Sequence, residues 1–442
     1  MIKGFHKGGI HPVENKLSCA AEIVNLPLPE TAYVSLSQHA GVPATPVVAK
    51  GDKVLVGQLI GQSAGFISSN VHAPVSGTVT AVDHLPDAGG IRRQTVVIAV
   101  EGDEWAPGID RSSALITQIE LSPEEIIKRI ADAGVTGMGG AAFPTQVKLT
   151  IPPGKKAEML IINGAECEPY LTADHRLMLE QGEEMLVGTI ILARALGVEQ
   201  IFIGIETNKP DAIAHLTKLA GSYHNIIIIP LHVQYPQGGE KQLIEAIAER
   251  EVPSGGLPID VGVVVLNVAT AVATYEAVQK NKPLVERVVT VTGKSLAKPS
   301  NLRVRIGTPV NALISACGGM PKDAAKVIFG GPMMGRAISS TSAGITKGTS
   351  GVLIMRRKES LRPQASVCIR CSKCTGVCPM GLEPYMLYKL SVKRMFGELK
   401  EWYITDCIEC GSCSYACPAA LPLLDYIRVG KAEVIKNKNN NG

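Results

Sequence analysis

Eight of the 11 cysteines lie near the C-terminus, in two copies of one pattern. The copies are Cys368-x2-Cys371-x2-Cys374-x3-Cys378-Pro379 and Cys407-x2-Cys410-x2-Cys413-x3-Cys417-Pro418. This spacing lets three thiolates of one loop bind three corners of a [4Fe–4S] cube, while the fourth cysteine reaches a neighbouring cube. Zinc ribbons usually pair two C-x2-C knuckles and lack the third cysteine and the closing Cys-Pro. The pattern therefore predicts two [4Fe–4S] clusters and the transfer of single electrons.

The duplication further predicts that the two clusters exchange their fourth ligands. The ligands expected for cluster 1 are Cys368, Cys371, Cys374 and Cys417. Those expected for cluster 2 are Cys407, Cys410, Cys413 and Cys378. The three remaining cysteines, Cys19, Cys167 and Cys317, are expected to be small buried residues. Free thiolates for cluster assembly indicate a reducing, cytoplasmic environment.

Composition excludes several classes of protein. The chain has 442 residues, 45% of them hydrophobic and 19% charged, which is typical of a soluble protein with more than one domain. A net charge of +4 without a Lys/Arg stripe argues against nucleic acid as a partner. No uncharged apolar stretch reaches the roughly 18 residues of a membrane span, and the first residues lack the apolar core of a signal peptide. We expect no direct membrane span, although the protein could dock on a membrane.

The elements upstream of the cysteines predict a multi-domain α/β protein. Residues 1–115 alternate like short hairpin strands, and the phrases at 50–54 and 72–79 resemble the barrel-sandwich hybrid fold of biotinyl and lipoyl carriers. The lysine-bearing tip of those carriers is missing, so a structural or docking role is expected. His72 and His84 lie among predicted turns and are expected at the surface.

From Ser122, an expected helix N-cap, helical and β-branched segments alternate. Residues 120–285 are therefore predicted to form a Rossmann-like parallel α/β domain, with strands at 159–163, 200–205, 225–231 and 261–266. The remaining predicted parts are a small β-grasp-like (SLBB) module at 286–355, a helical two-cluster ferredoxin-like domain at 360–430 and a flexible tail at 431–442.

Glycine-rich and polar loops follow these helices and strands. Gly137, Gly139 and Gly140 would let backbone N–H groups approach a phosphate, and Lys148 would add a positive charge. Three further segments fall where strands end or helices begin, which is where open α/β sheets bind ligands. They are Asn163–Pro169, Gly238–Glu240 and Asn267–Thr270. These loops together favour a nucleotide site.

The first loop also carries a family resemblance. Gly137-Met-Gly-Gly-Ala-Ala-Phe-Pro-Thr145 resembles the Gly-Arg-Gly-Gly-Ala-Gly-Phe-Pro-Thr loop of the flavin-bearing, NADH-oxidising subunit of respiratory complex I, and the later segments follow in the same order. These segments lie between a predicted barrel-sandwich domain and a predicted two-cluster domain. In this combination, nearly the whole chain is similar to the C-subunit family of Rnf electron-transport complexes.

The resemblance implies non-covalent FMN and NAD(H) as substrate, with hydride transfer by the flavin and no catalytic side chain. The residues it assigns to FMN are Gly137, Gly139, Gly140, Lys148, Asn163, Glu166, Asn267 and Thr270. On the NADH side it assigns Phe143, Glu168, Gly239 and Glu240. The sequence departs from the complex I pattern at Met138, Ala165 and Lys241, which bears mainly on the NADH contacts.

The predicted function is that of a peripheral NADH dehydrogenase-type subunit of a membrane-bound, ion-translocating ferredoxin:NAD+ oxidoreductase, on the cytoplasmic face of the cell membrane. Its expected partners are a ferredoxin-like subunit and integral membrane subunits. One alternative is a soluble NADH-dependent reductase resembling the cobalamin reductases of microcompartments, which the barrel-sandwich domain disfavours. The other is a flavin-free electron-carrying scaffold, which the intact glycine loop and Asn163 disfavour.

Overall fold

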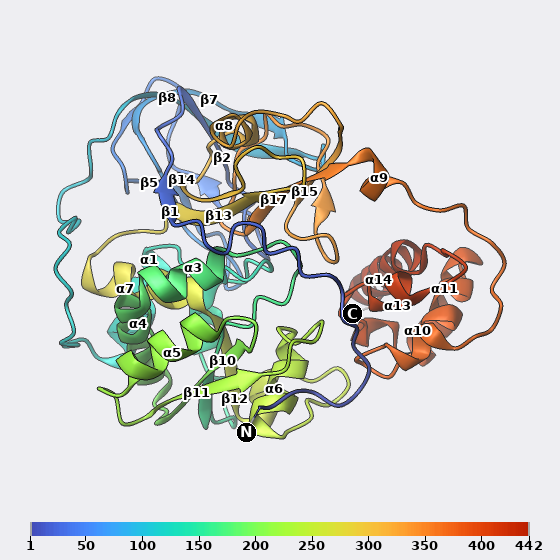
Figure 1. The fold of residues 1–442 in the computed structure, drawn as a ribbon. Helices are drawn as coiled ribbons and strands as arrows, with labels where there is room; N and C mark the ends of the chain where they lie inside the picture. The colour runs from blue at the N-terminus through green and yellow to red at the C-terminus, as the bar shows by residue number, and fades with distance from the viewer. Residues whose placement is uncertain (1, 441–442) are drawn as a thin grey trace.

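The computed structural model describes residues 2–440, which form four modules (Figure 1). A β-rich barrel module lies at the top of the view, an α/β module at the bottom, and a β-grasp-like module between them. A helical cluster module lies to one side, at the end of a long connection. No helix among residues 2–440 is both long and apolar enough to cross a membrane.

The barrel module consists of two antiparallel sheets whose inner faces share one core. One sheet has the order β2-β8-β7-β4 and the other β3-β5-β6. The strands are β2 (Thr31–Ser35), β3 (Thr45–Pro46), β4 (Lys53–Val54), β5 (Leu59–Gln62), β6 (Val71–His72), β7 (Ser76–Pro86) and β8 (Arg92–Gly102). Val34, Ile60 and Ile98 are fully buried between the sheets.

The surface prediction is wrong for His72, while His84 is exposed as predicted. His72 ends strand β6, where its side chain packs inside the module with 7% of its surface exposed. Burial, with a smaller contribution from Lys347, lowers the pKa of His72 to about 3, so the imidazole is neutral at physiological pH. The turn residues around it concealed a strand that faces inward.

The α/β module is built on a fully parallel sheet of order β11-β10-β9-β12. The strands are β9 (Met159–Asn163), β10 (Gln200–Glu206), β11 (Ile226–Leu231) and β12 (Val263–Asn267). The helices are α1 (Pro123–Asp132), α2 (Thr145–Leu149), α3 (Ala173–Glu180), α4 (Gly182–Leu196), α5 (Pro210–Ala220), α6 (Glu240–Ala248), the short η1 (Pro258–Val261) and α7 (Val268–Gln279). Ser122 begins α1 with a capping box, and the Asn267 side chain caps α7. Because all four strands run parallel, their carboxyl ends meet at one edge of the sheet, as predicted.

The β-grasp-like module has a mixed sheet of order β1-β14-β13-β17-β15-β16. Its elements are β13 (Glu286–Thr292), β14 (Ser300–Arg305), α8 (Val310–Ala316), β15 (Ala324–Phe329), β16 (Arg336–Ala337), β17 (Gly351–Arg356) and α9 (Arg357–Ser360). The edge strand β1 (Ile23–Asn25) comes from the N-terminal segment and pairs in parallel with β14. Residues before β2 thus pair with other modules, and the two barrel sheets contain only β2 to β8.

The cluster module is helical. Its elements are α10 (Lys373–Gly376), α11 (Pro384–Val392), α12 (Phe396–Glu401), η2 (Ile404–Asp406), α13 (Ser412–Ala416) and α14 (Leu423–Asn440). The predicted helical stretch over 383–402 breaks into α11 and α12, where Arg394 adopts a left-handed conformation with φ of 57°. The predicted tail differs too, because α14 continues through residues 431–440: Val434 packs into the core and Lys431 donates to the Cys407 carbonyl at 2.7 Å. Residues 441–442 of that prediction lie outside the described residues.

Candidate cofactor sites

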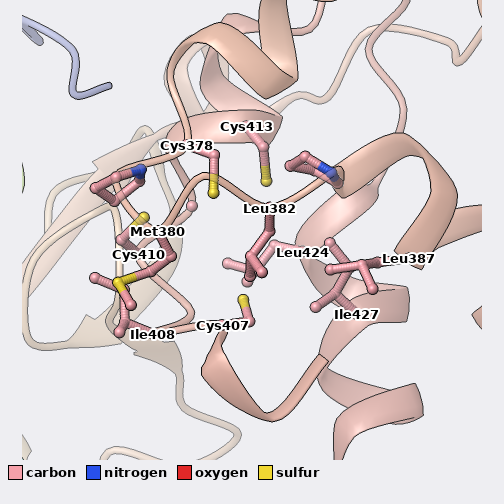
Figure 2. A pocket seen from close by; sticks show the side chains of 13 residues that line it. Cys378, Met380, Leu382, Leu387, Cys407, Ile408, Cys410, Cys413, Leu424 and Ile427 are labelled. Carbon is pink, nitrogen blue, oxygen red and sulfur yellow. The ribbon is translucent and has the colours of Figure 1, made fainter. Parts of the chain in front are cut away.

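One group of four cysteines surrounds an apolar cavity in the cluster module (Figure 2). Three of them come from the second cysteine run and the fourth from the first: Cys407, Cys410, Cys413 and Cys378. The sulfur atoms of Cys378 and Cys413 face that of Cys407 across the space that Leu382, Leu387, Leu424 and Ile427 enclose. This is the exchange of the fourth cysteine that the duplicated spacing predicts, and the ligand assignment itself stays a prediction.

The buried thiols of this group suit a cationic centre. Burial, with smaller contributions from the neighbouring Cys410 and Cys378, raises the pKa of Cys407 to about 11. The pKa of Cys413 is raised well above its usual range, again mainly by burial. Since iron binds thiolates, cluster binding would displace these protons. Within residues 2–440, no three His, Cys, Asp or Glu side chains lie close enough together to hold a single metal ion.

The other four cysteines lie nearer the surface. Cys417 lies near Cys374, whose pKa is raised mainly by burial and slightly by Cys417. Cys371 is exposed and Cys368 is partly exposed. Their loop also presents Val367 and Ile369, with 84% and 65% of their surfaces exposed. The two groups thus differ in exposure: one is enclosed and the other is open to solvent or to a partner.

The glycine loop is anchored from beneath by the other elements. The Met138 N–H donates to Thr270 Oγ1 at 3.0 Å, and the Gly137 N–H donates to the Phe143 carbonyl at 2.7 Å. The buried Arg287 guanidinium donates to the Met138 carbonyl at 3.3 Å. A side chain added at Gly140 would meet nothing within 4 Å, so this part of the loop is open. A loop fixed on one face and bare on the other fits phosphate binding by main-chain N–H groups.

Polar side chains meet beside this loop, at the carboxyl ends of the strands. Lys148 Nζ donates to Glu240 Oε1 at 2.6 Å and to the Val265 carbonyl at 3.0 Å. Asn163 Nδ2 donates to the Gly238 carbonyl at 2.9 Å, at the turn that leads into Gly239 and α6. Asn267 Nδ2 donates to Asp174 Oδ2 at 2.7 Å, and a side chain added at Gly139 would lie within 3.7 Å of Asn267. Segments more than a hundred residues apart are thereby brought to one edge.

Glu166 and Glu168 are engaged by protein groups on other elements. Glu166 accepts from the Asp174 and His175 N–H groups at the start of α3, at 2.8 and 3.2 Å. Glu168 accepts from the Met333 and Met334 N–H groups at 3.2 and 2.6 Å. These belong to the glycine-rich 330–335 loop of the β-grasp-like module, which packs against the α/β module here. Burial raises the pKa of Glu168 to about 7, although these N–H groups and Lys16 lower it.

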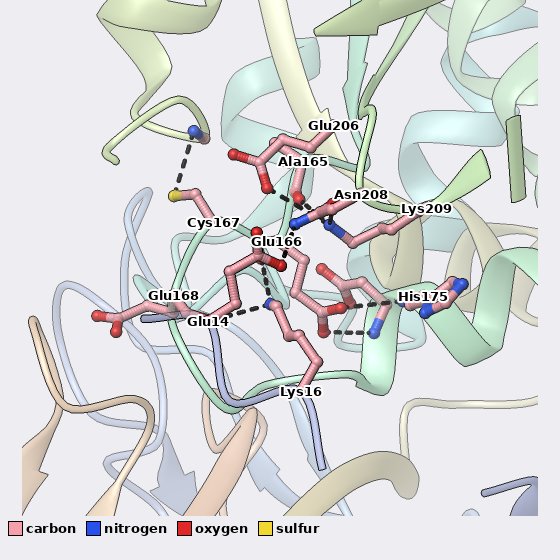
Figure 3. A network of polar contacts seen from close by, with 12 residues as sticks. Glu14, Lys16, Ala165, Glu166, Cys167, Glu168, His175, Glu206, Asn208 and Lys209 are labelled. Atoms are coloured by element: carbon pink, nitrogen blue, oxygen red, sulfur yellow. Dashed lines mark hydrogen bonds and ion pairs between the residues drawn. The ribbon is translucent and has the colours of Figure 1, made fainter. Parts of the chain in front are cut away.

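Two lysines that sequence reasoning missed hold the 165–171 loop by its carbonyls (Figure 3). Lys16 Nζ donates to the carbonyls of Glu166, Glu168 and Leu171 at 2.7, 3.0 and 2.7 Å. Lys209 Nζ donates to the Ala165 carbonyl at 2.7 Å and lies 3.4 Å from Glu206 Oε2. For Lys209 the only local signal in the sequence was its position three residues after Glu206, at the end of a buried strand. Nothing in the sequence linked Lys16 to a loop 150 residues away.

The enclosed cysteine group lies against the carboxyl edge of the α/β sheet. The buried Tyr235 hydroxyl donates to the Cys410 carbonyl at 2.8 Å. Ile10, Tyr235 and Cys410 share a small apolar core, against which Cys167 packs. Cys167 Sγ in turn accepts from the Gly238 N–H at 3.3 Å, next to Asn163. Of the three cysteines outside the runs, Cys317 is buried, whereas Cys19 and Cys167 are only partly buried.

Four family models match successive parts of the chain. They are described as the RnfC barrel sandwich hybrid domain (residues 4–103), the Nuo51 FMN-binding domain (130–276), the SLBB domain (288–337) and the 4Fe-4S dicluster domain (361–418). They confirm the predicted order of a barrel-sandwich domain, a flavin domain, an SLBB module and a two-cluster domain. They also confirm FMN and [4Fe–4S] clusters as the cofactors.

Curated relatives match over nearly the full length. The chain is 45% identical to the C-subunit of the Na+-translocating ferredoxin:NAD+ oxidoreductase complex of Acetobacterium woodii, covering 98% of both chains. It is 46% identical to the C-subunit of the proton-translocating ferredoxin:NAD+ oxidoreductase complex of Clostridium ljungdahlii, covering 98% of this chain and 94% of the relative. Among solved structures, a chain of an NAD+-reducing [NiFe]-hydrogenase shares the fold, with a TM-score of 0.50 and 18% identity. That match covers 71% of this chain and 63% of the hydrogenase chain.

Proposed function

We propose that this protein passes electrons between NAD(H), FMN and two [4Fe–4S] clusters. The premise is that the chain belongs to the C-subunit family of ion-translocating ferredoxin:NAD+ oxidoreductase complexes. NADH dehydrogenase-type chemistry is part of this proposal. The relatives' names support a ferredoxin:NAD+ reaction, and the flavin-domain and dicluster-domain matches supply a two-electron and a one-electron site.

The residues at the carboxyl edge of the α/β sheet would hold FMN. The open face of Gly137–Gly140 and the Lys148 ammonium would bind its phosphate, and Asn163, Asn267 and Thr270 would fix the loops around it. When bound, FMN supplies the exchange between a hydride and single electrons. Glu166 would act through the start of α3, which it caps. Phe143, Glu168 and Glu240 would border the NADH entrance.

The observation that carries the electron path is the hydrogen bond from Tyr235 to the Cys410 carbonyl. It fixes the enclosed group of Cys378, Cys407, Cys410 and Cys413 against the flavin edge, so cluster 2 would be proximal to the flavin. Cluster 1, in its exposed loop, would be distal and would face the partner that exchanges electrons with this protein. Electron transfer weakens steeply with distance, so an enclosed relay followed by an exposed terminus suits one member of a larger complex.

We further propose that the partners include a ferredoxin-like subunit and integral membrane subunits, with this chain on the cytoplasmic face of the cell membrane. The relatives are named as subunits of ion-translocating complexes, which supports a role in a translocase. Co-purification from native membranes tests this part: recovery with multi-span subunits would support it. Recovery only in the soluble fraction, with full NADH activity, would favour the soluble flavin reductase.

Anaerobic purification with cofactor analysis tests the core of the proposal. We expect about eight Fe and about one FMN per chain. Adding NADH is expected to bleach first the flavin and then the iron–sulfur absorption. A chain with full iron but no FMN would instead be the flavin-free scaffold, and flavin that NADH does not bleach would contradict the dehydrogenase role.

A further inference from the structure

Residues 3–25, here called the N-terminal strap, connect three modules before the barrel begins. In Figure 1 the strap runs from the α/β sheet, past the cluster module, to β1 at the edge of the β-grasp-like sheet. None of the sequence motifs assigns it a role. Its contacts with the cluster module fall on a predicted cluster ligand, which makes its position informative.

The first part of the strap is fixed to the α/β module. Lys3 forms a parallel bridge with Leu231 at the end of β11, and its ammonium donates to the Ile247 carbonyl at 3.1 Å and to Glu249 at 3.0 Å. Ile10 forms an antiparallel bridge with Tyr235, through N–H···O bonds of 2.9 and 2.8 Å. These two anchors hold both ends of residues 3–10 at the sheet edge.

The middle of the strap touches the first cysteine run through main-chain atoms. The Gly9 N–H donates to the Val377 carbonyl at 3.0 Å. Gly8 and Gly9 both have left-handed backbones, with φ of 72° and 88°, which favour glycine. A side chain added at Gly8 would lie 2.6 Å from the Cys378 carbonyl carbon and oxygen, so only glycine allows this approach. Gln234 Nε2 holds the Gly8 carbonyl at 2.9 Å.

The strap and Tyr235 thus hold the same cysteine group from two sides. Gly8 lies on Cys378 of the first run and Gly9 binds the neighbouring Val377, while the Tyr235 hydroxyl binds Cys410 of the second run. Tyr235 forms the backbone bridge with Ile10, so both contacts come from the place where these two segments pair. Cys378 and Cys410 line the same cavity.

The far part of the strap is equally fixed. Lys16 binds three carbonyls of the 165–171 loop. Asn301 of β14 donates to the Ser18 carbonyl at 2.9 Å, and β1 completes the sheet. In contrast, residues 361–372, which lead into the cluster module, contain no helix or strand, although Arg362 and Ser366 bind that module. Docking contacts therefore help to set where the cluster module lies.

We propose that the strap is a positioning element for electron transfer: Gly8 and Gly9 fix the Cys378 loop, and with it the proximal cluster, at the flavin edge. This inference rests on the proposed function. With both cofactors bound, the flavin would supply one electron to the proximal cluster, over a distance that the strap's contact with the Cys378 loop helps to set. Gly8 and Gly9 contact Phe5, Gln234, Val377 and Cys378, none of which is assigned to FMN or NADH, so hydride transfer should not depend on this contact.

The test compares Gly8→Ala with the parent and with Gly197→Ala in full-length, cofactor-loaded protein. Gly197 is a matched control, because it also has a left-handed backbone, with φ of 65°, but a side chain there would meet nothing within 4 Å. In Gly8→Ala we expect NADH to bleach the flavin at the parental rate and the clusters to be reduced about tenfold more slowly or worse. Dithionite should still reduce both clusters, showing that they are assembled.

Hydrogen exchange without NADH gives a readout that is independent of activity. The Gly9 N–H and the backbone around Val377 and Cys378 should exchange faster in Gly8→Ala and remain unchanged in Gly197→Ala. If Gly8→Ala does not retain both clusters, Gln234→Ala, which loosens the strap without a new side chain at the contact, decides by the same measurements. Cluster reduction at the parental rate in a variant with faster exchange would overturn the proposal. Failure of NADH to bleach the parental flavin would instead refute the proposed function.

Discussion

The two cofactor regions are organised in opposite ways. In the cluster module the functional groups lie within 50 residues, and their enclosed cavity is lined by apolar side chains and thiols whose pKa burial raises. At the flavin edge the groups come from segments between residues 137 and 270, and they already bind one another: Lys148 pairs with Glu240, and Asn267 binds Asp174. The cysteine spacing along the chain arranges the cluster region, whereas the parallel sheet and a polar network arrange the flavin edge.

This difference indicates how each region depends on its cofactor. A bound cluster would add metal–sulfur bonds to the four cysteines that line this cavity, so iron should contribute directly to the stability of the cluster module. At the flavin edge Lys148, Asn163 and Asn267 already make hydrogen bonds within the protein, so this edge should stay folded without FMN. We therefore expect substitutions in the cluster module to remove a cofactor outright, and those at the flavin edge to weaken binding by degrees.

The largest effect is expected from Cys378→Ser and Cys413→Ser. Each should remove the same cluster, lowering iron from about eight to about four per chain, and leave the same electron paramagnetic resonance (EPR) spectrum for the cluster that remains. Cys317→Ser, at a buried cysteine outside the runs, is the control and should keep all the iron. If Cys378→Ser removed the same cluster as Cys371→Ser, the exchange of fourth ligands would be wrong.

A graded effect is expected from Lys148→Met. It removes the positive charge beside the glycine loop and leaves the Glu240 carboxylate unpaired, so FMN affinity should fall by about ten- to a hundredfold. Iron content should not change. The exposed Lys128, paired with Asp132 on α1, gives the control Lys128→Met. Fluorescence titration of FMN into flavin-depleted protein measures the affinities, and equal values for both variants would remove Lys148 from the site.

The smallest effect concerns Glu168 and pH. Because burial raises its pKa to about 7, the folded protein binds this proton more tightly than the unfolded chain. Its contribution to stability is complete below its ordinary pKa of 4.5 and is lost as pH rises through about 7. The melting temperature of the parent should therefore fall more than that of Glu168→Gln across this window, by a few degrees. Parallel pH profiles would show that Glu168 is ionised throughout.

The same contrast explains what the sequence could predict. The cysteine groups followed from local spacing, and the flavin segments followed from the rule that the ends of parallel strands meet. Contacts between distant segments were not predictable: Lys16 on the 165–171 loop, Arg287 beneath Met138 and the strap on Cys378 carry no local motif. His72 and residues 431–440 were mispredicted because turn residues and charged residues concealed an inward-facing strand and a packed helix.

The most direct test of the electron path compares Cys378→Ser with Cys371→Ser after anaerobic addition of NADH, using EPR of frozen samples. In Cys371→Ser, which should lack only the distal cluster, NADH is expected to bleach the flavin and reduce the proximal cluster at the parental rate. In Cys378→Ser the flavin should bleach while the distal cluster stays oxidised. Reduction of the distal cluster at the parental rate in Cys378→Ser would contradict the proposed order of flavin, proximal cluster and distal cluster.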